Sequence, residues 1–268
     1  MLDLASRITP ADLAVFSAGG QNFLADLRGL VQETRTMSRE VTPVTSLGVV
    51  REPVRRGVSV TAKLTSRKVS GARVTHLDLG AISLAGVNLL GSLLAGRFEG
   101  ILQHQDAAGV GDEWQRPVLV GRDFRVRLRV AIDPSGSWVP GTLPLDSLPG
   151  QKSNFALNLN SVPISLPMLI HRTKQIAEQK QVQIWEIDLL GNQPTTGSGT
   201  GSGMGLLESA LNAPATPLTI ETRAESTTAP LTTGAFLVQK FGFGFTAAEV
   251  VESDYTWVST GPVQAVMP

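Results

Sequence analysis

Three arginines on one predicted strand are the most pointed chemical feature of the sequence. Residues 124–132 read FRVRLRVAI, so that Arg125, Arg127 and Arg129 alternate with apolar residues. Alternate side chains of a pleated strand point to opposite faces, and the segment is therefore predicted to be a strand with one apolar face and one basic face. Such a row of guanidinium groups binds carboxylates, phosphates or the surface of a neighbouring subunit.

Two acidic residues on another predicted strand could complement that row. Glu186 and Asp188 share one face of residues 182–190, which read VQIWEIDLL. They could serve as a pair of hydrolytic carboxylates, or they could pair with the arginines in the assembled sheet. Our candidates for a subunit interface are therefore Arg125, Arg127, Arg129, Glu186 and Asp188. A solvated strand face and a nucleic-acid site stay open for the arginines, although Phe124 alone lies nearby to stack on a base.

A third group of residues has the composition of a sugar-binding site. Asp112 and Glu113 stand beside Trp114, which is the pattern of an acid pair at an aromatic sugar platform. The simpler interpretation is a loop that leads into the following strand. No Gly-x-Ser-x-Gly motif is present, so serine hydrolase chemistry has no nucleophile elbow.

Metal and cofactor chemistry find no suitable residue pattern. The three histidines, His76, His104 and His171, stand in different predicted settings, and none is paired with a second histidine at i+2 or i+4; cysteine is absent. The nearby acids Asp78 and Asp106 are interpreted as ordinary surface neighbours. Residues 191–205 read GNQPTTGSGTGSGMG, which lacks the GxGxxG spacing and the Gly-Lys-Ser/Thr ending of phosphate loops. We expect this segment to be a flexible loop, and we expect no catalytic residue, cofactor, metal or enzymatic activity.

The elements that must position these residues are mainly strands. Alternating or β-branched segments predict strands over residues 58–64, 124–132, 182–190, 218–225, 235–245 and 255–260. One amphipathic helix is predicted over residues 165–180, because apolar residues recur at the i, i+3, i+4, i+7 spacing. A shorter helix is expected to open at Thr9. The predicted fold class is mainly β, an antiparallel β-sandwich or barrel with one amphipathic helix and long loops.

The organisation predicted from composition is one β-rich structural domain over residues 1–268. It has an N-terminal arm, about residues 1–25, and inserted loops at residues 103–116, 133–148 and 191–217. The uncharged segment 79–96 contains four glycines, two serines and Asn88, so that a buried strand and turn or a core helix is favoured over a membrane span.

The charge balance narrows the classes of function. Lysine and arginine number 23, as do aspartate and glutamate, which gives a formal net charge of zero. This argues against a dedicated nucleic-acid binder, since such domains carry a basic excess. The opening MLDLASRITP lacks the basic end and apolar run of a secretory signal, so we expect the protein to begin in a cytoplasm.

Both ends of the sequence resemble bacteriophage tail tube proteins. Residues 21–66 read QNFLADLRGLVQETRTMSREVTPVTSLGVVREPVRRGVSVTAKLTS, with a turn at residues 44–48, an Arg-Glu step at Arg51 and Glu52, and an alternating strand after Gly57. From Gly242 onward, an acidic turn precedes the aromatic strand in VVESDYTWVSTGPVQ. The similar segments are the first quarter and the last tenth of the chain.

The resemblance implies a self-assembling virion protein of β-sandwich or barrel fold. Such proteins form rings, commonly sixfold, that stack into a hollow tail tube. The implied partners are copies of the chain and other tail or virion proteins, and DNA passes through the lumen without specific binding. The implied location is the virion, assembled in the host bacterial cytoplasm without a membrane. Exposed sheet edges, a liability in a monomer, become assembly elements in a polymer.

Three other interpretations remain open. A β-barrel capsid or capsid-decorating protein would build or bind shells rather than tubes. A carbohydrate-binding or hydrolytic β-sandwich would use Asp112, Glu113 and Trp114. A nucleic-acid binder would use the arginine row, and its affinity would fall steeply with salt because bound phosphates release counterions.

Overall fold

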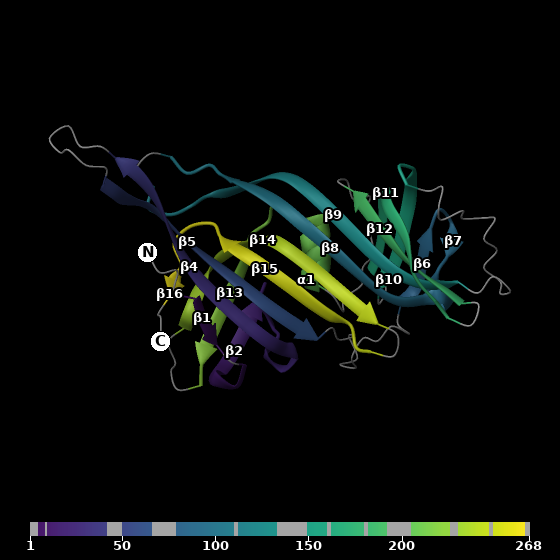
Figure 1. The fold of residues 1–268 in the computed structure, drawn as a ribbon. Helices are drawn as coiled ribbons and strands as arrows, with labels where there is room; N and C mark the ends of the chain where they lie inside the picture. Colours follow the sequence, from purple (N-terminus) through teal and green to yellow (C-terminus); the bar gives the residue numbers. More distant parts are fainter. Residues whose placement is uncertain are drawn as a thin grey trace.

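One open antiparallel sheet contains every strand of the part of the chain that the structure describes (Figure 1). The computed structural model describes residues 5–8, 10–41, 50–65, 79–109, 112–132, 149–159, 162–179, 182–191, 205–225, 230–246 and 249–265. The strands are β1 (Ala5–Ile8), β2 (Leu13–Ala18), β3 (Gln21–Asn22), β4 (Leu27–Val41), β5 (Val50–Thr65), β6 (Leu79–Leu84), β7 (Val87–Asn88), β8 (Leu93–Asp106), β9 (Pro117–Ile132), β10 (Lys152–Leu159), β11 (Val162–Gln179), β12 (Val182–Gly191), β13 (Leu218–Ala224), β14 (Pro230–Thr246), β15 (Glu252–Ser259) and β16 (Gln264–Ala265). The helices are α1 (Gly205–Asn212) and the 3-10 turns η1 (Pro10–Asp12), η2 (Leu24–Asp26) and η4 (Leu90–Ser92). The mainly β fold class is confirmed.

The helix predicted over residues 165–180 is wrong, because residues 165–179 are part of the strand β11. Buried residues alternate strictly along its first part, at Ile164, Leu166, Met168 and Ile170. The register then shifts just after Ile170 and again after Gln175. Each bulge changes the phase of a period-two pattern, and two bulges in succession produced an apolar spacing that imitates 3.6.

Other sequence predictions fall on defined elements. The six predicted strands correspond to β5, β9, β12, β13, β14 and β15, although two of the predictions run one residue past the strand end, at Glu225 and Thr260. Residues 79–96 form β6, β7, η4 and the start of β8, so that the strand-and-turn interpretation is confirmed. The helix expected from Thr9 is the single turn η1. Among the described residues, no helix has the length and apolar character needed to cross a membrane.

Not all of the predicted loops can be placed. Residues 103–106 complete β8, and residues 107–109 and 112–116 lead into β9. Residues 205–217 contain α1 and the turn that follows it. Residues 133–148, 192–204 and His76 lie outside the described residues.

Two seven-stranded units of the same topology make up the sheet. In the first unit, neighbouring strands follow the order β4-β5-β15-β14-β13-β2-β3. In the second, the order is β8-β9-β12-β11-β10-β6-β7. The second unit, residues 79–191, is inserted between β5 and β13 of the first. We call it the inserted unit and call the first, residues 10–65 and 218–265, the flanking unit.

The strand register of the two units is also the same. Leu27 pairs with Leu64 in the flanking unit, and Leu93 pairs with Val130 in the inserted unit, so that both partners are shifted by 66 residues (27 to 93, 64 to 130). Both strand pairs have a bulge immediately after this position. The agreement of register and bulge shows an internal structural repeat.

The same turn opens the main hairpin of each unit. Asn22 accepts a hydrogen bond from the backbone N–H of Leu24 at 3.0 Å, and Asn88 accepts the same bond from Leu90 at 3.0 Å. An asparagine side chain that bonds the backbone two residues later stabilises a turn locally. The sequence therefore encodes the entry to β4 and the entry to β8 with the same device.

A cluster of phenylalanine rings joins the two units. Phe98 of β8 stacks on Phe243 of β14 with ring centroids 5.2 Å apart. The rings are fully buried, and two glycines of β8 make space for their neighbours. A Cβ atom at Gly100 would lie 2.3 Å from the ring of Phe241, a distance that real Cβ atoms do not show. The junction is thus a packed core in which β8 must carry glycine.

Candidate assembly surface

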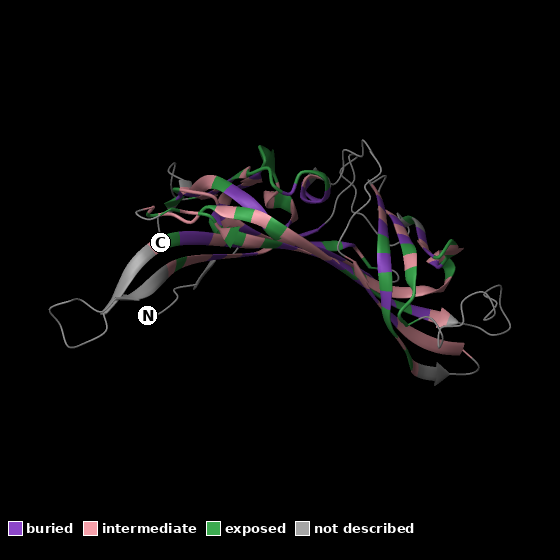
Figure 2. Cartoon of the chain, turned by 90° about the horizontal axis from the view of Figure 1, so that it is seen from above, coloured by how far each residue is buried: buried purple, intermediate pink, exposed green. Residues whose placement is uncertain are grey.

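The sheet is curved, and its two faces differ in character. Figure 2 shows the long strands as an arc, with α1 and the shorter strands on the convex side. The residues that point toward this side form the hydrophobic core, which includes the phenylalanine cluster and four apolar residues of α1. Alternation along β8, β9 and β12 sends the charged residues to the other, concave face.

The arginine row lies on that concave face in the inserted unit. Arg125, Arg127 and Arg129 of β9 are exposed, whereas the residues between them are buried. In the sheet register, Asp188 of β12 lies opposite Arg127, and Glu186 lies opposite Arg129. The structure therefore brings the five predicted interface residues together within one chain.

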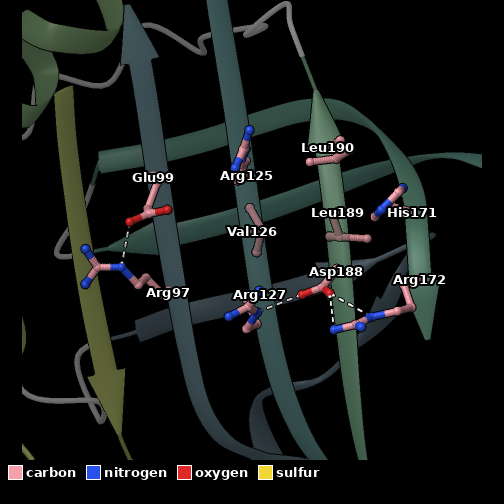
Figure 3. A pocket seen from close by; sticks show the side chains of 10 residues that line it. All are labelled: Arg97, Glu99, Arg125, Val126, Arg127, His171, Arg172, Asp188, Leu189 and Leu190. Carbon is pink, nitrogen blue, oxygen red and sulfur yellow. Dashed lines mark hydrogen bonds and ion pairs between the residues drawn. The ribbon is translucent and has the colours of Figure 1, made fainter. Parts of the chain in front are cut away.

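An ion-pair network holds the centre of this group. Arg127 Nε donates to Asp188 Oδ1 at 2.8 Å and lies 3.3 Å from Glu186 Oε1 (Figure 3). On the other side of the carboxylate, Arg172 Nη2 lies 3.0 Å from Asp188 Oδ2. Only 14% of the Asp188 side chain is exposed, against 65% for Arg127, so that two largely exposed cations cover a shielded carboxylate. The hydrogen bond with Asp188 raises the pKa of the Arg127 guanidinium.

A second network connects the inserted unit with the flanking unit. Arg97 of β8 donates to Glu99 at 2.8 Å and to Asp254 of β15 at 2.9 Å. Lys240 of β14 lies 3.5 Å from the same Glu99 oxygen. Burial on its own would raise the pKa of Glu99, but the hydrogen bond from Arg97 and the positive charges of Arg97 and Lys240 together outweigh it, and the pKa lies below its usual value. This carboxylate therefore stays charged at the junction.

The two networks border a shallow depression of about 460 Å³. Its lining includes Arg97, Arg125, Arg127, Arg172 and His171, with Glu99 and Asp188 as the acidic members (Figure 3). Within the described residues, Arg125 and Arg129 form no ion pair. Cations therefore outnumber carboxylates here, and this excess of positive charge attracts anions weakly.

The sugar-site candidates have structural tasks instead. Asp112 accepts a hydrogen bond from the backbone N–H of Gly109 at 2.8 Å, and the Glu113 carbonyl accepts one from Arg56 at 2.7 Å. Trp114 packs against the hydrophobic core and forms an isolated bridge with Arg56. These contacts fasten the end of the β8–β9 hairpin onto β5 of the flanking unit.

An arginine completes this fastening. Arg55 of β5 donates to Asp106 at 2.6 Å and to the carbonyls of Ala108 and Gly109 at 2.7 and 3.0 Å. Asp106 also accepts backbone N–H bonds from Ala108 and Arg116. Burial opposes ionisation, but these hydrogen bonds and Arg55 together lower the pKa of Asp106. We call residues 106–116 the strap.

The histidines do not assemble into a metal site. His104 is half-buried on β8, where burial lowers the pKa of its imidazole, and His171 is exposed on β11. Among the described residues, no group of three or more histidine, aspartate or glutamate side chains is placed to hold a metal ion.

Sequence reasoning missed Arg97, Glu99, Arg172 and Lys240, which belong to the same concave networks. Arg97 and Glu99 stand two residues apart in the segment GRFEG, which was a usable sign of one polar strand face. Arg172 was assigned to a helix, and that error hid its place opposite Asp188.

Comparisons with known proteins concern structure alone. No family model matches the sequence, and no curated protein is similar to it. Eight solved chains are similar in structure. One, from the virion of a native gene transfer agent particle, has a TM-score of 0.35 and 14% identity, covering 45% of this chain and 97% of its own.

Two further solved structures are similar over larger parts of this chain. The E. coli c3393 protein, a type VI secretion system component described as similar to the T4 bacteriophage tail proteins gp27 and gp5, has a TM-score of 0.33 and 10% identity over 70% of this chain and 80% of its own. A chain from the tail of an empty gene transfer agent particle with C6 symmetry has a TM-score of 0.28 and 9% identity over 59% and 93%. The proteins to which this chain is similar are thus components of virions, tails or a tail-like secretion system.

Proposed function

We propose that the protein is a non-enzymatic structural component of a virion tail, whose copies join side by side into rings that stack into a tube. The observation that carries the proposal is the β14–β8 junction, where one unit joins a second unit of the same topology edge to edge along a curved sheet. A unit that repeats such a contact with constant rotation closes into a ring. The resemblance of both chain ends to tail tube proteins points to the same role.

The internal repeat sets the number of chains in a ring. The resemblance implies a sixfold ring, and each chain supplies two equivalent units. Three chains therefore furnish six units, and we expect a ring mass about three times the 28.4 kDa of one chain. Six chains would instead supply twelve units and a much wider ring.

The concave face is the proposed wall of the lumen. In a ring closed by this curvature, the side without covering elements faces inward (Figure 2). The proposal thus assigns Arg125, Arg127 and Arg129 to the lumen wall and not to the junction between chains. Because Asp188 and Glu186 neutralise part of the row, the wall attracts DNA weakly, which suits passage without specific binding. We further propose that the protein is assembled into the virion in a bacterial cytoplasm, together with other tail proteins.

Negative-stain electron microscopy with light scattering tests this function. Rings or hollow tubes of uniform width, built from multiples of three chains, are the expected result. Closed shells would favour the capsid interpretation instead. A monomer at every concentration, with and without other tail components of the same particle, would overturn the proposal. The sugar-binding interpretation has lost its main support, because Trp114 packs against the core rather than standing free as a platform.

A further inference from the structure

The junction inside one chain defines a second contact that one chain cannot make by itself. β14 of the flanking unit pairs with β8 of the inserted unit. By topology, the equivalent of β14 is β11 and the equivalent of β8 is β4. Those two strands lie toward opposite ends of the sheet, so that they can meet only between two copies (Figure 1). This inference rests on the proposed assembly into rings.

The internal register fixes the register of the second contact. Positions on β8 correspond to β4 with a shift of 66 residues, as Leu93 does to Leu27. From Val238 to Phe243, positions on β14 correspond to β11 with a shift of 68, since Val238 pairs with Trp257 as Ile170 pairs with Leu189 (238 minus 170, 257 minus 189). The bulge after Gln175 in β11 has no counterpart in β14, so the shift is used only up to Gln175. Gly242 lies opposite Glu99 at the internal junction. Lys174 of one copy therefore lies opposite Glu33 of the next.

Charge is preserved between the two contacts. Lys240 lies 3.5 Å from Glu99 at the internal junction. Their equivalents are Arg172 on β11 and Glu33 on β4, again a cation and an anion. The same register places Arg172 directly opposite Arg35, where the internal junction has Lys240 opposite Ile101, so that Glu33 is the anion shared by these cations. Glu33 also faces Lys174 in this register, and opposite charges on facing strands stabilise their pairing. Glu33 is partly exposed and bound in its own chain only to Arg35, at 2.8 Å, among the described residues.

The two edges differ in what occupies them within one chain. β10 pairs with β11 only as far as Leu169, and no described strand continues along that edge from Arg172 onward. On β4, residues 30–33 pair with β1, residues 5–8. β1 thus covers the positions that β14 covers on β8, but with four residues instead of the seven paired at the internal junction.

We propose that β11 of one copy pairs with β4 of the next in this register, and that β1 holds the same edge in an isolated chain and leaves it on assembly. A short strand on an exposed edge prevents indiscriminate pairing. Exchange for β11 offers the edge residues 172–179 of β11 in place of the four residues of β1, and it adds two cations around Glu33. The contact then repeats head to tail until the ring closes.

Cross-linking tests the register. The chain has no cysteine, so that introduced pairs react without background. In Glu33→Cys/Lys174→Cys, directly opposed residues of an antiparallel pair lie within reach of a disulfide. Mild oxidation of the assembled protein is expected to give covalent oligomers. Glu33→Cys/Gln175→Cys is the matched control, because a shift of one residue places the second thiol on the other face of the sheet.

Locking β1 tests the exchange. Ala5→Cys/Glu33→Cys opposes two thiols within one chain, and the oxidised protein is expected to stay monomeric by light scattering until a reductant is added. Ile101→Cys/Lys240→Cys locks the internal junction with the same chemistry and is expected to leave assembly unchanged.

The outcomes separate this inference from the proposed function. Rings that form without cross-linking above the control overturn the register, and a locked variant that assembles as fast when oxidised as when reduced overturns the exchange. In both cases the tail function stands. If wild type and all variants remain monomeric in both redox states, the proposed function fails together with the inference.

Discussion

The flanking and inserted units share their topology and most of their register and bulges, yet the edges at β4 and β8 are occupied differently. β8 of the inserted unit receives a neighbouring strand and packs bare glycines under phenylalanine rings. β4 of the flanking unit carries leucine and threonine at the equivalent positions, Leu30 and Thr34, and is covered by the short β1. The comparison indicates that turns and alternating apolar residues determine the strand topology. The residues at each edge depend on which strand must pair with that edge.

The largest effect is expected at the glycine beneath the phenylalanine cluster. In Gly100→Ala, the new Cβ would lie 2.3 Å from the buried ring of Phe241, and overpacking of this kind should lower the free energy of unfolding by about 3 kcal/mol. Urea unfolding measures it.

The flanking unit offers a control with the same chemical change. Gly29 corresponds to Ala95, and a Cβ at Gly29 would meet no atom within 4 Å. Gly29→Ala is expected to raise the free energy of unfolding by about 0.5 kcal/mol, because the unfolded chain loses freedom. Equal effects of the two substitutions would show that the junction is not packed as described.

The next largest effect is expected in the strap. Asp106→Asn removes the carboxylate that pairs with Arg55 at 2.6 Å, and the unfolding free energy at pH 7 should fall by about 2 kcal/mol. The pKa of Asp106 is lowered in the folded protein, so its stabilising contribution is present above the ordinary value of 3.8 and is lost as pH falls through the folded value. The difference between wild type and variant should therefore shrink in acid, and a pH-independent difference would contradict the ion pair.

Much of the flanking unit and little of the repeat could be predicted from the sequence in advance. Alternation identified β5, β9, β12, β13, β14 and β15, since each buries one face. The bulged β11 was misread because bulges break the period on which such reasoning depends. The repeat was nevertheless visible in the paired segments SAGGQNFLADL and SLAGVNLLGSL, which share serine, glycine, asparagine and leucine at equal spacing.

The candidate surface was predictable only in part, for a physical reason. Alternation along each strand predicts that the arginines share one face and that the two acidic residues share one face. Whether the two sets pair depends on which strands are neighbours in the sheet. Neighbour choice is a long-range property: β12 reaches β9 from more than fifty residues away. Trp114 likewise packs against the core because the strap is bonded to β5, and no local sequence pattern predicts those contacts.

A smaller effect is expected from replacing the ion pair Arg127–Asp188 by the threonine pair found at the equivalent positions of the flanking unit. Thr61 and Thr256, 3.1 Å apart through their hydroxyls, occupy in the flanking unit the positions of Arg127 and Asp188. Asp188→Thr alone leaves cations without their shared anion and should cost about 1 kcal/mol, less at high salt. Adding Arg127→Thr should recover about half of that cost, and no recovery would contradict the equivalence. Urea unfolding at low and high salt measures both.

The smallest effect concerns the turn between β2 and β3 and its equivalent between β6 and β7. In the flanking unit this turn is Gly19–Gly20, and in the inserted unit it is Ala85–Gly86, where Ala85 has a φ of 53°. A left-handed conformation costs alanine about 1 kcal/mol relative to glycine in the folded protein. Glycine also has more conformational freedom in the unfolded chain, which offsets part of the stabilisation that the substitution gives. Ala85→Gly should therefore stabilise the protein by about 0.5 kcal/mol in thermal unfolding. Gly19→Ala makes the opposite change in the other unit and should destabilise by a similar amount, since both turns bear the same backbone geometry.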